Sequence, residues 1–259
     1  AIITTDIISC YINFYTCKDT KYRQKIKAVF MNKTKDNSEI VYETIKKEII
    51  DATRKPGDIF NEKEFAANMG ISRTPVREAV LRLSNEGLLV VMPRRGTFVS
   101  HISMADVRDM YQVRKILEPQ IAYIAAQKCD KDIVKQWRNF FKEEKTTGKS
   151  HSKDYIHPGN KTLDVYSDSD ALFHIFIAEC TGNKLLISQV EELMTLTQRI
   201  RCLSNAVMED RFLSAVAEHI AITKALTASD SDGAAKAMLV HLENSEKGYS
   251  GITQLDFTI

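Results

Sequence analysis

The chain has 259 residues, of which 44% are hydrophobic and 27% charged, so it is long enough for two domains with packed cores. The formal net charge is only +2, but basic residues are concentrated near the N-terminus. Residues 1–37 carry seven basic and three acidic side chains, residues 72–101 carry five and two, and residues 103–259 carry 19 and 22. This distribution predicts an anionic partner for the N-terminal half. No run of about 18 apolar residues occurs, which excludes a membrane-spanning segment.

The cysteines are scattered along the chain, and none form a CxxC pair. This usage predicts buried thiols in a reducing cytoplasm rather than a disulfide framework or a zinc knuckle. The five are Cys10, Cys17, Cys129, Cys180 and Cys202.

Residues 1–36 are assigned as an N-terminal extension of unknown role. The segment Ile2–Tyr15 is rich in β-branched and aromatic residues, and a basic run over Lys18–Lys27 follows it. A signal peptide has its positive charge before its apolar segment, so this order argues against one. The pattern leaves open whether residues 1–30 belong to the working protein.

Two helices separated by a tight turn are predicted next. The first opens at Ser38, and its apolar residues, Ile40, Val41, Ile45 and Ile49 among them, recur at helical spacing. The run Arg54–Asp58 ends it, because proline and glycine there favour a turn. The second helix is capped by Asn61 and extends to Met69.

The segment from Gly70 to Gly87 predicts a turn and then a helix with clear start and stop signals. Gly70 can take the left-handed conformation that a tight turn needs, and Gly87 ends the helix. The start carries typical capping residues: Ser72 or Thr74 as the cap, Pro75 in the first turn, and Glu78 closing a capping box.

This helix has one apolar and one basic face. Arg73 and Arg77 point away from the apolar side chains and lie beside the hydroxyls of Ser72 and Thr74. Arginine pairs with guanine edges, hydroxyls either donate or accept, and a helix N-terminus favours phosphate, so the pattern predicts a helix that reads the DNA major groove. Arg82, further along, is predicted to be a solvated charge. The apolar face is Val76, Val80, Leu81 and Leu83.

A β-hairpin is predicted after this helix, with strands at Leu88–Val91 and Thr97–Val99 and a turn at Pro93–Gly96. Three helices followed by a hairpin with two arginines at its tip predict a winged helix-turn-helix over residues 37–101. Such arginines can reach the DNA backbone or the minor groove.

Residues 102–250 are predicted to form an all-helical bundle, so the whole chain is expected to be mainly α. Strands and helices do not alternate there, which excludes a dinucleotide-binding or P-loop fold. After a linker at Ser100–Ser103, the expected helices are Ser103–Lys128, Asp130–Gly148, Ser169–Cys180, Asn183–Val207, Asp210–Ala228 and Ser231–Lys247, with a polar loop at Lys149–Tyr166. Ile116 and Ile124 are included in the apolar set of the first.

Histidines carry the chemistry of this bundle. Asp170 and His174 are four residues apart on one helical face, and His219 and His241 fall on the apolar faces of two other helices. A single inward histidine is usually a hydrogen-bonded core residue, but burying each of four such groups without a partner costs about 1–3 kcal/mol. One divalent transition metal would satisfy all four: zinc first, with nickel, manganese or iron as alternatives. His151 and His157 in the polar loop are expected to be solvent-exposed.

Residues 40–100 resemble the DNA-binding domain of the GntR family of bacterial transcription regulators. The resemblance lies in Lys55–Gly57, Glu62–Ala66, Gly70–Glu78, Glu86–Leu88 and Pro93–Val99. Together with the hydroxyl of Ser72, it implies DNA contacts from Lys63, Arg73, Thr74 and Arg77, with Arg95 and Gly96 on the wing. Arg73 and Arg77 are expected to matter most.

The rest of the chain resembles the FCD domain, the effector-binding helical bundle of the FadR branch of this family. The matching residues are Arg114–Glu118, Asp170–His174, Glu218–Ile220 and His241–Leu242. The resemblance implies one metal per subunit on Asp170, His174, His219 and His241, completed by the carboxylate of a small organic acid. Arg114 is implied to pair with that carboxylate; the alternative is an ion pair with Glu118 one turn along the helix.

The function expected from the sequence is a cytoplasmic, homodimeric, sequence-specific DNA-binding regulator, with repression as the expected sign and no enzyme activity. A carboxylate effector at the metal is expected to control binding to a pseudo-palindromic operator. Two alternatives are left open: a metal-dependent enzyme that uses the Asp/His site, and a metal-free DNA-binding dimer without small-molecule control.

Overall fold

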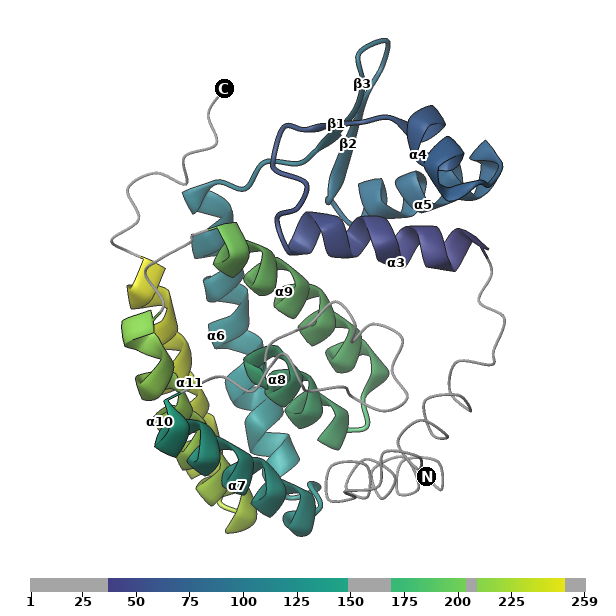
Figure 1. Ribbon diagram of the computed structural model, residues 1–259. Coiled ribbons are helices and arrows are strands. Elements are labelled where there is room, and N and C mark those ends of the chain that lie inside the picture. The colour runs from purple at the N-terminus through teal and green to yellow at the C-terminus, as the bar shows by residue number, and fades with distance from the viewer. Residues whose placement is uncertain (1–36, 149–168, 204–208, 250–259) are drawn as a thin grey trace.

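The computed structural model describes residues 37–148, 169–203 and 209–249. Figure 1 shows a small N-terminal part, which holds the strands, beside a larger part whose described elements are all helices. In these ranges no helix is both long and apolar enough to cross a membrane. The N-terminal extension, the loop with His151 and His157, and the expected end of the helix at Val207 lie outside the described residues.

The N-terminal part is a winged helix-turn-helix, as predicted. Its helices are α3 (Asn37–Ile50), α4 (Glu62–Met69) and α5 (Arg73–Asn85), and its strands are β1 (Ile59–Phe60), β2 (Leu89–Met92) and β3 (Gly96–Val99). The antiparallel sheet has the order β1-β3-β2, with Phe60 opposite Thr97 and Met92 opposite Gly96. β1 was not predicted, because two residues are too few to show an alternating pattern.

The caps of the two short helices differ from each other. Asn61 caps α4 as predicted, accepting from the amides of Lys63 and Glu64, and Gly70 ends it with φ of 66°. Ser72 is the N-cap of α5 but makes no side-chain capping bond, so the predicted capping box is wrong. The reason is that Pro75 occupies the third helical position and has no N–H to donate.

The apolar face of α5 packs into a core shared with α3 and the sheet, which includes Ile45, Val76, Leu83 and Val99. Leu81 was predicted to belong to this face, but 63% of it is exposed. It lies beyond the edge of the stripe that α3 covers.

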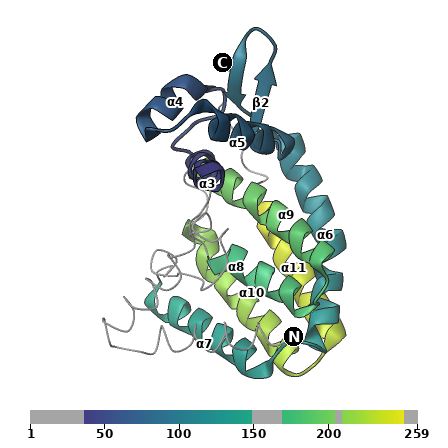
Figure 2. The same cartoon turned by 90° about the vertical axis from the view of Figure 1, so that its right-hand side faces the viewer.

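The helical part contains α6 (Met104–Ala126), α7 (Lys131–Thr147), α8 (Ser169–Cys180), α9 (Lys184–Leu203), α10 (Glu209–Thr227) and α11 (Ser231–Tyr249). Helix α6 packs against α11, α10 lies against α7 and α11, and α8 lies against α9 and α6 (Figure 2). The helix starts expected at Ser103 and Asp130 are confirmed: Ser103 caps α6 in a capping box with Asp106, and Asp130 caps α7. Ile116 and Ile124 were predicted to belong to the apolar face of α6, but 64% and 37% of these residues are exposed, so that part of the prediction is wrong.

The two parts meet at an apolar cluster that is separate from the core of the winged domain. Ile102, Tyr111, Ile200 and Tyr249 are buried there, and Ala52, which follows α3, packs against them. Helix α3 also lies beside α9 in both views of the molecule (Figures 1 and 2). The segment that joins the parts is therefore packed rather than free.

The cysteine prediction is wrong for one pair. Cys129, just after α6, and Cys180, the last residue of α8, form a disulfide with a Cα–Cα distance of 5.0 Å. The two lie 51 residues apart in sequence, so only the packing of α8 against α6 brings them together. Cys202 is a free thiol.

Candidate functional site

The first candidate site is the face of the winged domain that carries the exposed start of α5. A groove of about 430 Å³ lies between α5, the start of α4 and the first residues of β3. Four of the predicted DNA-contact residues, Lys63, Arg73, Arg77 and Gly96, line it. Arg73 and Arg77 are 51% and 64% exposed, so their guanidinium groups are accessible to a ligand.

The other three predicted DNA contacts lie on the same elements without lining the groove. Ser72 and Thr74 are exposed at the start of α5, and Arg95 is exposed in the turn between β2 and β3. Gly96 follows with φ of 118°, a conformation that favours glycine. The structure thus places the start of α5 and the first residues of β3 around one groove.

Arg82 is exposed, as predicted for a solvated charge, with 49% of its side chain accessible, but it also has partners that the sequence did not show. Its guanidinium donates to Glu39 at 3.0 Å, pairs with Glu86, and lies 3.5 Å from the ring centre of Tyr42. These partners tie α5 to α3, so Arg82 serves the packing of the domain.

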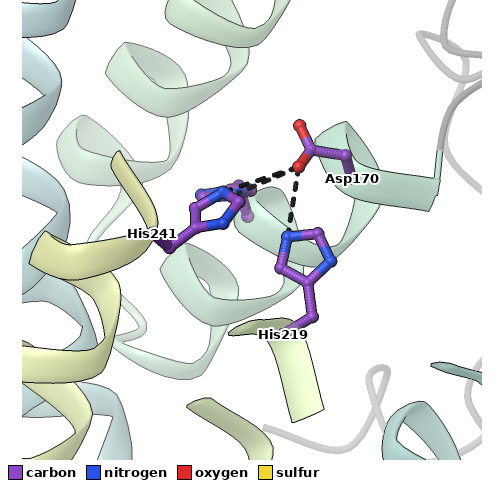
Figure 3. A group of neighbouring side chains, drawn as sticks. Asp170, His219 and His241 are labelled. Carbon is purple, nitrogen blue, oxygen red and sulfur yellow. Dashed lines mark hydrogen bonds and ion pairs between the residues drawn. The ribbon is translucent and has the colours of Figure 1, made fainter. Parts of the chain in front are cut away.

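The second candidate site lies inside the helical bundle, where Asp170 faces His219 and His241 (Figure 3). Asp170 Oδ1 lies 3.1 Å from Nε2 of His219, 3.6 Å from that of His241 and 3.8 Å from that of His174. One ligand atom from each residue can be chosen such that all four lie within 4.8 Å of one another. The three histidines are at most 2% exposed, so the structure brings together the four predicted ligands from α8, α10 and α11.

Carboxylates set the orientation of two of these histidines. Glu118 of α6 contacts Nδ1 of His174, and Glu218 of α10 lies 2.9 Å from Nδ1 of His241. A carboxylate there accepts a hydrogen bond from Nδ1–H, which leaves Nε2 unprotonated with a lone pair. The Nε2 atoms of His174 and His241 then face each other at 3.3 Å. Converging lone pairs beside a carboxylate suit a cation, so the donor set fits a divalent metal.

The protonation of the site agrees with this reading. Burial lowers the pKa of His241 to about 3 and also lowers that of His219. Burial alone would raise the pKa of Asp170, but its contact with His219 and the neighbouring imidazoles hold it well below the usual range. Neutral imidazoles and an ionised carboxylate are the forms that bind a metal.

The FCD domain family matches residues 109–244, more than half of the chain, and the bacterial regulatory proteins of the gntR family match residues 37–99. The chain belongs to the GntR family of transcriptional regulators with an FCD domain. It is therefore a DNA-binding transcriptional regulator rather than an enzyme.

Individual relatives agree with the family. The Escherichia coli HTH-type transcriptional repressor RspR is 28% identical over 225 residues, which cover 86% of this chain and 93% of RspR. The Nta operon transcriptional regulator of Aminobacter aminovorans is 28% identical over 189 residues, which cover 73% of this chain and 83% of that regulator. The solved structure of E. coli McbR/YncC shares the fold, with a TM-score of 0.65 at 19% identity, covering 85% of this chain and all of the other.

Each carboxylate around the candidate metal site of this GntR regulator is paired with an arginine. Arg201 donates to Asp170 at 2.9 Å, and Arg211 and Arg114 pair with the other two carboxylates. Among the residues that contact the candidate ligands or their carboxylates, the sequence assigned no role to Glu218, Arg201 or Arg211. Glu218 directly precedes His219 in the chain. The function of these three residues depends on contacts between helices, which sequence spacing does not show.

For Arg114 the geometry favours the ion pair over a direct effector contact. Its Nε lies 2.5 Å from Glu118, and Arg114 is 1% exposed. Burial would raise the pKa of Glu118, but the charge of Arg114 and the contact with His174 lower it to about 2. Arg114 thus keeps Glu118 ionised against His174, and its direct contact with an effector stays a prediction.

Proposed function

We propose that this GntR regulator is a homodimeric repressor whose operator binding is controlled by a small organic acid at a divalent metal. The metal would be held by Asp170, His174, His219 and His241, one ion per subunit. The observation that carries the proposal is the convergence of one nitrogen from each imidazole and one carboxylate oxygen within 4.8 Å. Nitrogen and oxygen donors suit zinc first, and nickel, manganese or iron as alternatives.

The charge around the site supports an anionic effector. Asp170, Glu118 and Glu218 are each matched by an arginine, so these side chains alone are close to neutral. A divalent cation would add two positive charges to a buried site, and a carboxylate ligand would offset part of them. When bound, the metal would supply open coordination positions and a positive charge for that carboxylate.

The DNA end of the mechanism rests on the basic groove of the winged domain. Arg73 and Arg77 would contact bases in the major groove, with Lys63, Ser72, Thr74 and the wing residues Arg95 and Gly96 at the backbone or the minor groove. A dimer would place two recognition helices about one helical turn of DNA, roughly 34 Å, apart.

A homodimer is consistent with the surface of the bundle. GntR regulators often dimerise, and Val113, Ile116, Tyr123 and Ile124 form an exposed apolar stripe along α6. Such stripes are typical of surfaces that a partner covers. For the sign of regulation, the support is that RspR, which matches 86% of this chain, is named a repressor.

A thermal-shift screen tests the proposal. Metal-loaded protein is melted with a panel of small carboxylic acids, and the screen is repeated after the metal has been removed with a chelator. A ligand at 100 times its dissociation constant stabilises a protein by about 2.7 kcal/mol, which is roughly 5–10 °C for a domain of this size. We expect at least one acid to give such a shift only when metal is present.

His219→Ala is the matched variant, because it removes one ligand from the site. It should lose the metal-dependent shift while still binding operator DNA. If the chelator changes nothing and no acid binds, the histidines are core residues and the metal-free alternative holds. If His219→Ala still responds to the acid, the effector binds elsewhere.

A further inference from the structure

One acidic side chain lies among the basic residues of the groove on the winged domain. Glu62 Oε2 lies 3.7 Å from a terminal nitrogen of Arg73 and 3.4 Å from Nε of Arg77. The Glu62 side chain is 23% exposed, less than half the value of either arginine. One carboxylate therefore bridges two exposed guanidinium groups that lie one turn apart on α5.

The backbone at Glu62 is fixed from both sides. Asn61 caps α4 directly before it, and Phe60 pairs with Thr97 of β3. The ring of Phe60 also lies 5.3 Å from that of Phe65, which is buried on the next turn of α4. Because these contacts fix Glu62 at the start of α4 and beside the wing, its carboxylate can orient the arginines before DNA arrives.

The position of Glu62 in the first turn of a helix does not by itself explain this contact. Acidic residues in first turns are stabilised by the helix dipole, and Glu64 occupies the same turn of α4. Glu64 is exposed and does not line the groove, whereas Glu62 does. Exposed ion pairs add little to folding stability, so the consequence of this bridge lies in what the arginines bind.

We propose that Glu62 is a positioning residue that gives Arg73 and Arg77 their selectivity between specific and non-specific DNA. The proposal rests on the proposed assignment of these arginines to DNA contact. A guanidinium binds any phosphate as well as the O6 and N7 edge of guanine. The Glu62 carboxylate lowers the positive charge offered to phosphates and is itself repelled by them. At a G·C pair it can instead accept a hydrogen bond from cytosine N4 while an arginine reads the guanine.

The test compares two duplexes and three proteins. The wild-type protein selects a cognate duplex from a random library, and a scrambled duplex of the same composition is the non-specific probe. Dissociation constants for both are measured over a range of salt concentrations for the wild type, Glu62→Gln and Glu64→Gln. Glu64→Gln is the matched control, because it removes the same charge two residues away and outside the groove.

For Glu62→Gln we expect tighter binding to the scrambled duplex, with a salt slope steeper by about one. The dissociation constant for the scrambled duplex divided by that for the cognate duplex should fall about tenfold in Glu62→Gln. Glu64→Gln should keep the wild-type value of this ratio. Partial unfolding cannot produce this result, because it weakens binding to both duplexes. An unchanged ratio, or equal changes in both variants, would overturn the proposal. Arg77→Ala, measured alongside, tests the underlying assignment: if it binds the cognate duplex with wild-type affinity, Arg77 does not contact DNA.

Discussion

Arg199 of α9 donates hydrogen bonds to both the hydroxyl and the carbonyl oxygen of Ser100, in the segment that joins the two domains. Arg199 is 2% exposed, and burial lowers its pKa to about 10. Two residues further along α9, Arg201 donates to the proposed metal ligand Asp170. One helix therefore contacts both the candidate metal centre and the linker to the DNA-binding domain, which makes it a physical route for coupling.

Arg199→Met is predicted to weaken this coupling. Methionine keeps much of the apolar stem but removes both hydrogen bonds to Ser100, so a shift of α9 would no longer move the linker. Coupling energies of regulators are typically 1–3 kcal/mol, a change of about 5–150-fold in affinity. We expect the factor by which metal and acid change operator affinity to fall towards one, as measured by DNA titrations with and without both ligands.

The control for this experiment is Ser100→Ala, which removes the hydroxyl, including its hydrogen bond to the carbonyl oxygen of Leu88, but keeps the carbonyl acceptor of Ser100. It should retain most of the response. The melting temperature of Arg199→Met must also be measured, since loss of a buried hydrogen bond typically costs about 1–3 kcal/mol. A folded Arg199→Met protein with the full wild-type response would show that coupling does not pass through this contact.

Glu118→Gln is predicted to weaken metal binding without removing a ligand. Glutamine cannot hold the Nδ1 proton of His174 as strongly as an ionised carboxylate, so the imidazole becomes a poorer and less oriented donor. Changes of this kind typically cost 10–100-fold in metal affinity. Competition with a chromophoric chelator measures it, and Glu143→Gln, an exposed change on α7, is the matched control. Equal affinities for the two variants would contradict the role of Glu118.

The sequence was sufficient to predict the elements whose signals are local. The caps at Asn61, Ser103 and Asp130, and the left-handed Gly70, lie where the sequence places them. Helical spacing also puts each of the four predicted metal ligands on an inward face, but the meeting of these faces from three helices was implied by the resemblance to the FCD domain. The cap predictions depend on residues within about one helical turn of one another.

Features that depend on distant contacts could not be predicted in this way. The contact of Glu118 with His174 joins residues 56 apart, and that of Arg199 with Ser100 joins residues 99 apart. The i,i+4 pair of Arg114 with Glu118 was foreseen as an alternative, but its link to the metal site needs the packing of α8 against α6. The predicted burial of Leu81 was wrong for the same reason. Periodicity identifies the apolar stripe of a helix, but it does not show how wide a part of that stripe the neighbouring elements cover.

Arg77→Ala and Arg82→Ala are predicted to separate DNA binding from packing on the same helix. Arg77 faces the groove, so its loss should cost about 1–3 kcal/mol of operator affinity and relax specificity at one position. Arg82 instead pairs with Glu39 and Glu86 on the α3 side. Arg82→Ala should leave operator affinity within about twofold and lower stability by no more than about 1 kcal/mol. DNA titrations measure the operator affinity of the two variants, and urea unfolding measures their stability. If Arg82→Ala lost operator affinity and Arg77→Ala did not, the assignment of the two helix faces would be wrong.

The disulfide between Cys129 and Cys180 predicts that a reductant destabilises the protein, whereas the cysteine usage had predicted buried thiols. It closes a loop of 51 residues that includes α7 and α8. A crosslink of this kind typically stabilises a protein by about 2–4 kcal/mol, because it restricts the unfolded chain. Urea unfolding with and without a reductant should show that difference, and Cys180→Ser should unfold like the reduced wild type under both conditions. Alkylation of the denatured protein, followed by mass spectrometry of its peptides, should label Cys129 and Cys180 only after reduction. Labelling of both without a reductant would mean that the pair is present as thiols, as the sequence had suggested.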